Sequence, residues 1–220
     1  MEEKTLKKLW QTSNEKLEET FILNRKNTED ITKLKVQSFL SSMKPLKIFT
    51  ILVGLIWVGL GGVIIINLFI FAYSKFSLFF LYSAGIQLLL TAIALVIYIY
   101  QLILIHQVDI SEPVLATQGK LASLKSSTLL VARILFLQLP VWTTFYLSKS
   151  IFENGQTILH LVQGIVTLLF TYIAIWLFFS IKYENKDKKW FKLIFHGKEW
   201  TPIIKSMELC REIEEFKQDN

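Results

Sequence analysis

Ile48–Phe71 has the sequence IFTILVGLIWVGLGGVIIINLFIF, an apolar run interrupted only by Thr50 and Asn67. As an α-helix this run would extend about 36 Å, at about 1.5 Å per residue. The hydrocarbon core of a bilayer is about 30 Å thick, so the run is long enough to cross it with some tilt. It therefore predicts a membrane-spanning helix.

Three further apolar runs of similar character follow, at Leu78–Ile105, Leu129–Leu147 and Ile158–Ile181. Four such runs in 220 residues would leave a soluble protein without a polar shell. The chain is therefore predicted to be an all-α integral membrane protein with four spans in a helical bundle. We expect residues 1–47 to form a cytoplasmic amphipathic arm, residues 48–181 the spans, and residues 182–220 a cytoplasmic interfacial segment followed by an amphipathic helix.

The distribution of Lys and Arg predicts which side of the membrane each connection occupies. Residues 1–47 carry ten of these cations and the tail after Ile181 carries nine, whereas Lys75 and Lys149 are alone in the two shortest connections. The middle connection, residues 106–128, is intermediate, with Lys120 and Lys125. We therefore expect both termini and the middle connection to be cytoplasmic. The charged first segment and the long first span do not fit a cleavable signal peptide.

Apolar residues recur at helical spacing in both cytoplasmic ends. In the arm, Leu6, Leu9 and Trp10 are followed by Leu17 and Phe21, and a second stripe, Val36 to Met43, follows Asn27 as a predicted helix cap. Pro45 is placed to begin a new helix at the membrane. Two interpretations of the arm stay open: it packs on the membrane surface or on itself, or it is a docking helix for a cytoplasmic partner.

The remaining cytoplasmic segments also predict helices. Asp109–Pro113 is expected to cap a helix that runs into the third span without a break. Thr201-Pro202 should begin the last helix, which would pack on the arm, the middle helix or another molecule. Its apolar stripe consists of Ile203, Met207, Cys210, Ile213 and Phe216. Between them, cations mixed with aromatic residues predict a segment at a surface of anionic lipid headgroups, with Lys186, Lys188, Lys189 and Lys192 as contacts.

Polar side chains inside the spans have two interpretations. They either hydrogen-bond one helix to the next or line a solute pathway. The candidate residues are Arg133, Gln87, Gln101, Gln138, His160 and Gln163. Gly54, Gly59 and Gly62 are expected to let the first span approach its neighbours, and Pro140 should kink the third span.

No catalytic, metal or nucleic-acid motif is recognisable in the sequence. The three histidines, His106, His160 and His196, lie in three different regions, and the single cysteine, Cys210, allows no internal disulfide. Acidic residues interleave with the basic ones at both ends, unlike a nucleic-acid-binding surface. We therefore expect a protein that is not an enzyme, has no cofactor or metal and does not bind nucleic acid.

The stretches Asp109–Pro113, Arg133–Tyr146, Tyr183–Phe191 and Gly197–Pro202 resemble a family of uncharacterised four-span bacterial membrane proteins. The resemblance extends from about residue 30 to the end and implies the bacterial inner membrane as the location. It implies no activity. Separately, Leu9-Trp10-Gln11 resembles the amino-terminal, sigma-binding helices of some membrane-anchored anti-sigma factors.

The leading hypothesis is therefore a membrane protein that binds a cytoplasmic partner in a regulatory or scaffolding role. Its predicted binding residues are Leu6, Leu9, Trp10, Ile203, Met207, Ile213 and Phe216. The alternative is a small transporter or transporter subunit that uses the polar faces of the second to fourth spans. Self-association is left open by the sequence.

Overall fold

The computed structural model describes residues 2–108, 114–149, 151, 157–195, 197 and 200–218. The side chains of residues 2–4, 6, 25, 114–115 and 212–218 are not described. Within the described residues the chain is helical and contains no strand. The predicted all-α class is therefore confirmed for this part of the chain. The predicted cap at Asp109–Pro113 lies outside the described residues.

Helix α1, Glu2–Phe71, is a single helix of 70 residues. The predictions that a helix begins after Asn27 and another at Pro45 are therefore wrong. Thr28 donates its hydroxyl to the carbonyl of Asn24 at 2.9 Å, inside the helix rather than at its start. Pro45 also lies inside the helix. Proline removes one backbone hydrogen bond, but packing of the flanking turns can keep a helix continuous through it.

Four helices are long and apolar enough to cross a membrane. They are the second half of α1, then α2 (Leu78–Gln107), α3 (Val114–Phe136) continued by α4 (Leu139–Thr144), and α6 (Thr157–Ser180). The third candidate span was predicted to kink at Pro140, and the helix is interrupted there, between Phe136 and Leu139. The reason is steric, because a proline ring clashes with the carbonyl four residues earlier, and here that carbonyl belongs to Phe136, the last residue of α3.

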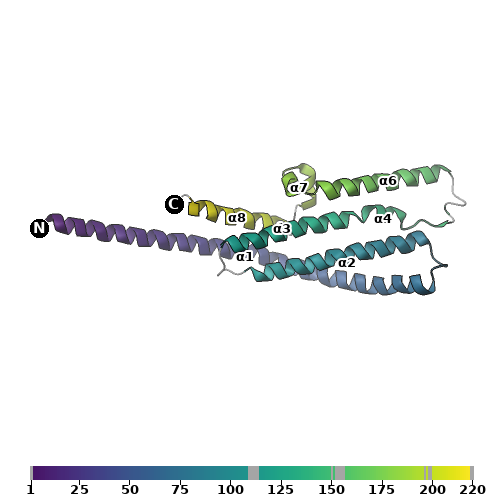
Figure 1. Cartoon of the computed structure of the whole chain (residues 1–220), viewed down its shortest axis with the longest axis horizontal. Coiled ribbons are helices and arrows are strands. Elements are labelled where there is room, and N and C mark those ends of the chain that lie inside the picture. The colour runs from purple at the N-terminus through teal and green to yellow at the C-terminus, as the bar shows by residue number, and fades with distance from the viewer. Residues whose placement is uncertain are drawn as a thin grey trace.

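The four candidate spans lie side by side in a row, in chain order (Figure 1). Helix α1 packs on α2, α2 packs on α3 and α4, and these two pack on α6. Within the described residues, α1 and α6 have no extensive contact with each other. This open row differs from the predicted bundle, in which the four spans would share one core.

Two glycines of α1 allow it to approach α2 closely. A Cβ atom on Gly54 would lie 2.7 Å from Cδ1 of Leu95, and one on Gly61 would lie 2.9 Å from Cδ2 of Leu88. Gly59 and Gly62, in contrast, have nothing within 4 Å of such an atom. The prediction was therefore right for Gly54 and wrong for the other two, because Gly54 and Gly61 are seven residues apart and share the face turned to α2.

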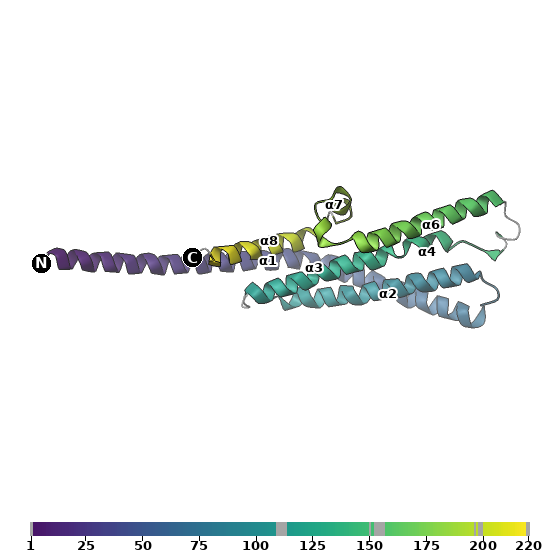
Figure 2. The ribbon, with the colours of Figure 1, turned by 45° about the horizontal axis from the view of Figure 1, so that its top comes forward.

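A bundle of four helices does form, but at the end of the row that holds both termini. There α8, Thr201–Gln218, packs against α1 and α3. Figures 1 and 2 show α8 running back along α1. The shared core of this "end bundle" comes from α1, the end of α2, α3 and α8. Its buried members are Val36, Leu40, Met43, Leu104, Ile105, Val108, Leu121, Leu124, Ile203 and Cys210.

Two short elements join α6 to α8. The 3-10 helix η1 covers Tyr183–Asn185, and α7 covers Lys189–Phe195. Figures 1 and 2 show α7 turned across the direction of the row. Phe191 and Phe195 stack with their ring centroids 4.4 Å apart, and Trp200 packs on both rings. This aromatic cluster holds α7 against the ends of α3 and α6.

Candidate functional site

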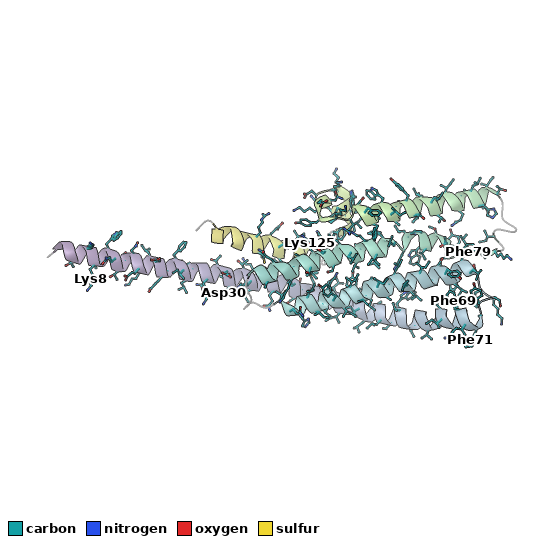
Figure 3. All side chains as sticks on the ribbon, viewed as in Figure 1. Lys8, Asp30, Phe69, Phe71, Phe79 and Lys125 are labelled. Carbon is teal, nitrogen blue, oxygen red and sulfur yellow. The ribbon has the colours of Figure 1, made fainter. Side chains whose placement is uncertain are left out.

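The first part of α1 projects beyond the rest of the molecule (Figure 2). We call residues 2–35, which precede the first buried residue Val36, the "projecting arm". Every described side chain from Thr5 to Asn24 is exposed. Figure 3 shows side chains extending from all sides of this helix, with Lys8 near its tip and Asp30 close to the end bundle.

The exposed side chains of the projecting arm include large apolar ones. Leu9 is 64% exposed and Trp10 is 70% exposed, and their predicted binding role requires this accessibility. The exposed apolar side chains continue along the arm through Leu17, Phe21, Ile31 and Leu34. The side chain of the third predicted residue, Leu6, is not described. A lone helix with so much exposed apolar surface gains little from packing, so it is a candidate for contact with another molecule.

The predicted binding residues of the last helix have a different environment. Ile203 is fully buried in the end bundle and Met207 packs against the same core. The side chains of Ile213 and Phe216 are not described. The start of the apolar stripe on α8 therefore contacts α1 and α3 of its own chain, so Ile203 is inaccessible to a second molecule while the bundle is intact.

Lys47 is a buried cation that the sequence analysis did not identify. Its ammonium donates to Oε1 of Gln101 at 2.6 Å and lies 4.5 Å from the centroid of the Tyr98 ring. Both Lys47 and Gln101 are fully buried, and Nε2 of Gln101 has no hydrogen-bond partner among the described residues. Helical spacing contained the signal, because 36, 40, 43 and 47 continue one stripe.

The polar residues of α6 bond to α4. The Gln163 amide donates to the carbonyl of Thr143 at 2.7 Å and accepts from the hydroxyl of Tyr146 at 2.7 Å. The Thr143 hydroxyl in turn donates to Oγ1 of Thr167 at 3.1 Å. Gln163 therefore joins two helices, as the packing interpretation predicts.

Two further bonds join α2 to the third span. Gln138 donates from Nε2 to Oγ1 of Thr91 at 3.0 Å. The hydroxyls of Ser83 and Thr144 lie 2.9 Å apart. Gln87 is different, because no hydrogen bond of its side-chain amide is found in the described part of the chain. Of the predicted intramembrane residues on α2, Gln101 therefore bonds to another helix and Gln87 does not.

Arg133 and His160 bond to backbone carbonyls. Nε of Arg133 donates to the carbonyl of Ile181 at 2.7 Å, which ties α3 to the end of α6. This carbonyl follows the last turn of α6, where helix carbonyls lack an intrahelical donor. Nε2 of His160 lies 2.8 Å from the carbonyl of Ile151. Arg133 thus has a packing role at the end of α6, on the side of the row that holds the end bundle.

The predicted headgroup contacts Lys186, Lys188, Lys189 and Lys192 are all exposed. Lys186 lies 4.9 Å from the Tyr183 ring centroid, and Lys125 of α3 lies 3.9 Å from the same centroid. Leu193, the most exposed large apolar residue, is 83% exposed on α7. Cations beside an exposed leucine on a crosswise helix match a membrane-surface segment.

Cavities lie along the row as separate spaces. One of about 510 Å³ lies between α1 and α2 and includes Trp57, Leu60, Phe80 and Gln87 in its lining. Another, of about 460 Å³, lies beside α7 and is lined by Tyr98, Phe136 and Trp200 among others. The two share no lining residue and are therefore separate spaces.

No family model, no curated protein and no solved structure matches this chain. Among the described residues, no three His, Cys, Asp or Glu side chains are grouped to hold a metal ion. The function proposed below therefore rests on the geometry of the chain.

Proposed function

We propose that this chain is an integral membrane protein that binds a partner protein on its cytoplasmic side, in a regulatory or scaffolding role and without enzymatic activity. The observation that carries the proposal is the projecting arm. It presents apolar side chains to solvent on a helix that continues, without a break, into the first candidate span. A partner bound there would be held next to the membrane by one rigid element.

The membrane location is supported by the surface of the row. Large apolar side chains are exposed along all four candidate spans, among them Leu60, Leu89, Trp142 and Leu168. In water this surface would be unfavourable by roughly 25 cal/mol per Å², whereas lipid tails accommodate it. Lipid also provides no drive for α1 and α6 to close into a bundle, which fits the open row.

The orientation is supported by the arrangement of the ends. Both termini lie at the end of the molecule that holds the end bundle (Figure 1). The same end carries most of the Lys and Arg residues. Because cations near span ends favour the cytoplasm, we assign the projecting arm, the end bundle and α7 to the cytoplasmic side. The membrane would be the bacterial inner membrane. Lys186, Lys188, Lys189 and Lys192 would then face anionic headgroups.

The transporter alternative has less support. Gln101, Gln138 and Gln163 bond to other helices of the chain, and Arg133 bonds to the carbonyl after α6. These bonds use the side chains that a solute pathway would require.

The proposal is tested by a quantitative pull-down of the full chain from native membranes that also contain a differently tagged second copy, so that recovery of other proteins and of a second copy are both measured. We expect Trp10→Ala combined with Leu17→Ala to remove the bound protein, as would deletion of residues 1–30, while membrane insertion is kept. Glu15→Ala combined with Glu19→Ala is the matched control, because these side chains are also exposed on the arm. Equal recovery of every co-purifying protein with both double variants would refute the proposal.

A further inference from the structure

The projecting arm contains a heptad repeat that extends over four repeats. Starting at Leu6, positions separated alternately by four and three residues are Leu6, Trp10, Ser13, Leu17, Thr20, Asn24, Asn27, Ile31 and Leu34. We call this set the "seam". None of its members is charged, although charged residues are frequent between them. Spacing of 3.5 residues is the pattern by which two helices supercoil around each other.

The seam is accessible in the structure. All its members with described side chains are exposed, from Trp10 to Leu34. The seam also differs from the face of α1 that enters the end bundle, which begins at Val36 and continues through Leu40 and Met43. Packing of α1 inside its own chain therefore leaves the seam available.

Charges around the seam favour a second, parallel copy of the same helix. The outward positions of the heptad hold most of the charge: Lys8, Glu15, Glu18, Glu19, Lys26, Glu29 and Lys33. In a parallel pair, a residue that flanks the seam on one helix faces the flanking residue five positions later on the other helix. This brings Asp30 opposite Lys35 and Lys16 opposite Phe21, so one pair is attractive and none joins like charges.

We propose that the arm pairs with the arm of a second copy, as a parallel two-stranded coiled coil over residues 6–34. Two copies in one membrane enter from the same side, so their arms run parallel and at the same height. Asn24 on the seam supports two strands in one register, since a buried Asn pairs best with its own copy. This inference rests on the proposed docking role of the arm and names its partner.

The other candidate surfaces fit the arm less well. Between Thr5 and Asn24, Lys7, Lys8 and Lys16 balance Glu15, Glu18 and Glu19. Over residues 2–35, eight Lys and Arg stand against seven Asp and Glu. The arm therefore has little net charge to attract anionic lipid, unlike the lysine-rich α7 segment. The arm also projects along the line of α1 instead of lying across the row as α7 does (Figure 1).

Disulfide trapping in native membranes tests the pairing with the full chain. Cys210 is first replaced by Ala, since it is the only native thiol. Leu17→Cys then places a thiol on the seam, where two parallel copies come within disulfide distance. Glu15→Cys is the matched control, exposed at an outward position two residues away. We expect mild oxidation to yield a species of doubled mass for Leu17→Cys and none for Glu15→Cys.

A second cysteine position on the seam tests whether the cross-link is peculiar to position 17. Asn24→Cys should cross-link in the same way, and adding Leu17→Asp should abolish that cross-link by placing two carboxylates across the seam. Because both positions are exposed in a single chain, the fold of each copy is expected to stay intact, which circular dichroism would verify.

The outcomes separate this inference from the proposed function. Equal cross-linking at positions 17 and 15, or none at either, overturns the pairing. If the pairing fails but the Trp10→Ala, Leu17→Ala variant still loses a different bound protein, the docking role stands with another partner. If neither effect is seen, both proposals fall.

Discussion

The buried pair of Lys47 and Gln101 shows at the residue scale how the end bundle joins the row. The buried ammonium of Lys47 donates to the side-chain oxygen of Gln101 and lies over the Tyr98 ring. These two groups take the place of water. A buried cation is costly unless polar groups surround it. The pair therefore specifies which turn of α1 meets which turn of α2, at the boundary between the apolar row and the end bundle.

Replacing Gln101 with Leu should lower the free energy of unfolding by about 1–3 kcal/mol, because a buried donor loses an acceptor. Adding Lys47→Met should recover part of this loss, since the cation is then gone as well. Unfolding in detergent micelles, arranged as a double-mutant cycle, measures both effects. If the double variant lost as much free energy of unfolding as the two single variants together, the assigned pairing would be contradicted.

Gln163 and Gln87 form a matched pair for the second residue-scale prediction. Gln163→Leu removes bonds to Thr143 and Tyr146 and should cost about 0.6 kcal/mol per bond, with about 1.7 kcal/mol as an upper value. Gln87→Leu should leave stability unchanged or raise it, because Gln87 lines the apolar α1–α2 cavity and no hydrogen bond of its amide is found in the described part of the chain. Thermal unfolding in detergent compares the two variants. Equal losses would argue against the packing role of Gln163.

At the element scale, α1 is the central feature, because it forms the projecting arm and contributes to both the end bundle and the row. Its continuity through Pro45 depends on contacts on both sides of the proline. Val36, Leu40 and Met43 are buried on one side, and Gly54 packs on α2 on the other. Tertiary contacts of this kind override local preferences for a helix end.

The glycine contacts give a prediction for this element. Gly54→Ile should destabilise the α1–α2 pair by about 1–3 kcal/mol through overpacking, since even a Cβ atom there meets Leu95. Gly59→Ile is the control. It introduces the same β-branched side chain into the same helix, at a position with no neighbour within 4 Å. Thermal stability in detergent should fall for the first variant only, and a similar fall for both would refute the assigned contact face.

At the scale of the whole molecule, the row and the end bundle differ in what holds them together. The end bundle has a shared apolar core, as expected where water drives burial. The row relies on small residues and interhelical hydrogen bonds, as the proposed membrane location predicts. The change from one type of packing to the other occurs at the level of Lys47 and Gln101. Helices α1, α2 and α3 run through this level without a break.

The proposed orientation predicts a labelling pattern. In a Cys210→Ala background, an impermeant maleimide should label Ser74→Cys on intact inner-membrane spheroplasts. It should label Thr12→Cys only after the membrane is permeabilised. Both positions are exposed in the structure, so accessibility within the protein does not separate them. Labelling of Thr12→Cys in intact spheroplasts would overturn the cytoplasmic placement of the arm.

Local patterns predicted the elements well. Run length and composition predicted four long apolar helices, and Pro140 predicted a kink in the third span, where the structure has a break after Phe136. Both predictions depend on neighbours in sequence. The same patterns misplaced helix starts at Asn27 and Pro45 and assigned Gly59 and Gly62 to contacts. For the candidate site, the exposed stripe at Leu9 and Trp10 was recognised, whereas the buried environment of Lys47 was not.

The amino-acid pattern was sufficient for helical class, the position of the apolar segments and the heptad of the projecting arm, since each arises from spacing along one helix. Which helices touch required the folded chain. Three features arise from residues far apart in sequence. They are the open order of the row, the burial of Ile203 in the end bundle and the pairing of Lys47 with Gln101. Their contacts depend on how whole helices are placed, and spacing within a single helix carries no information about that placement.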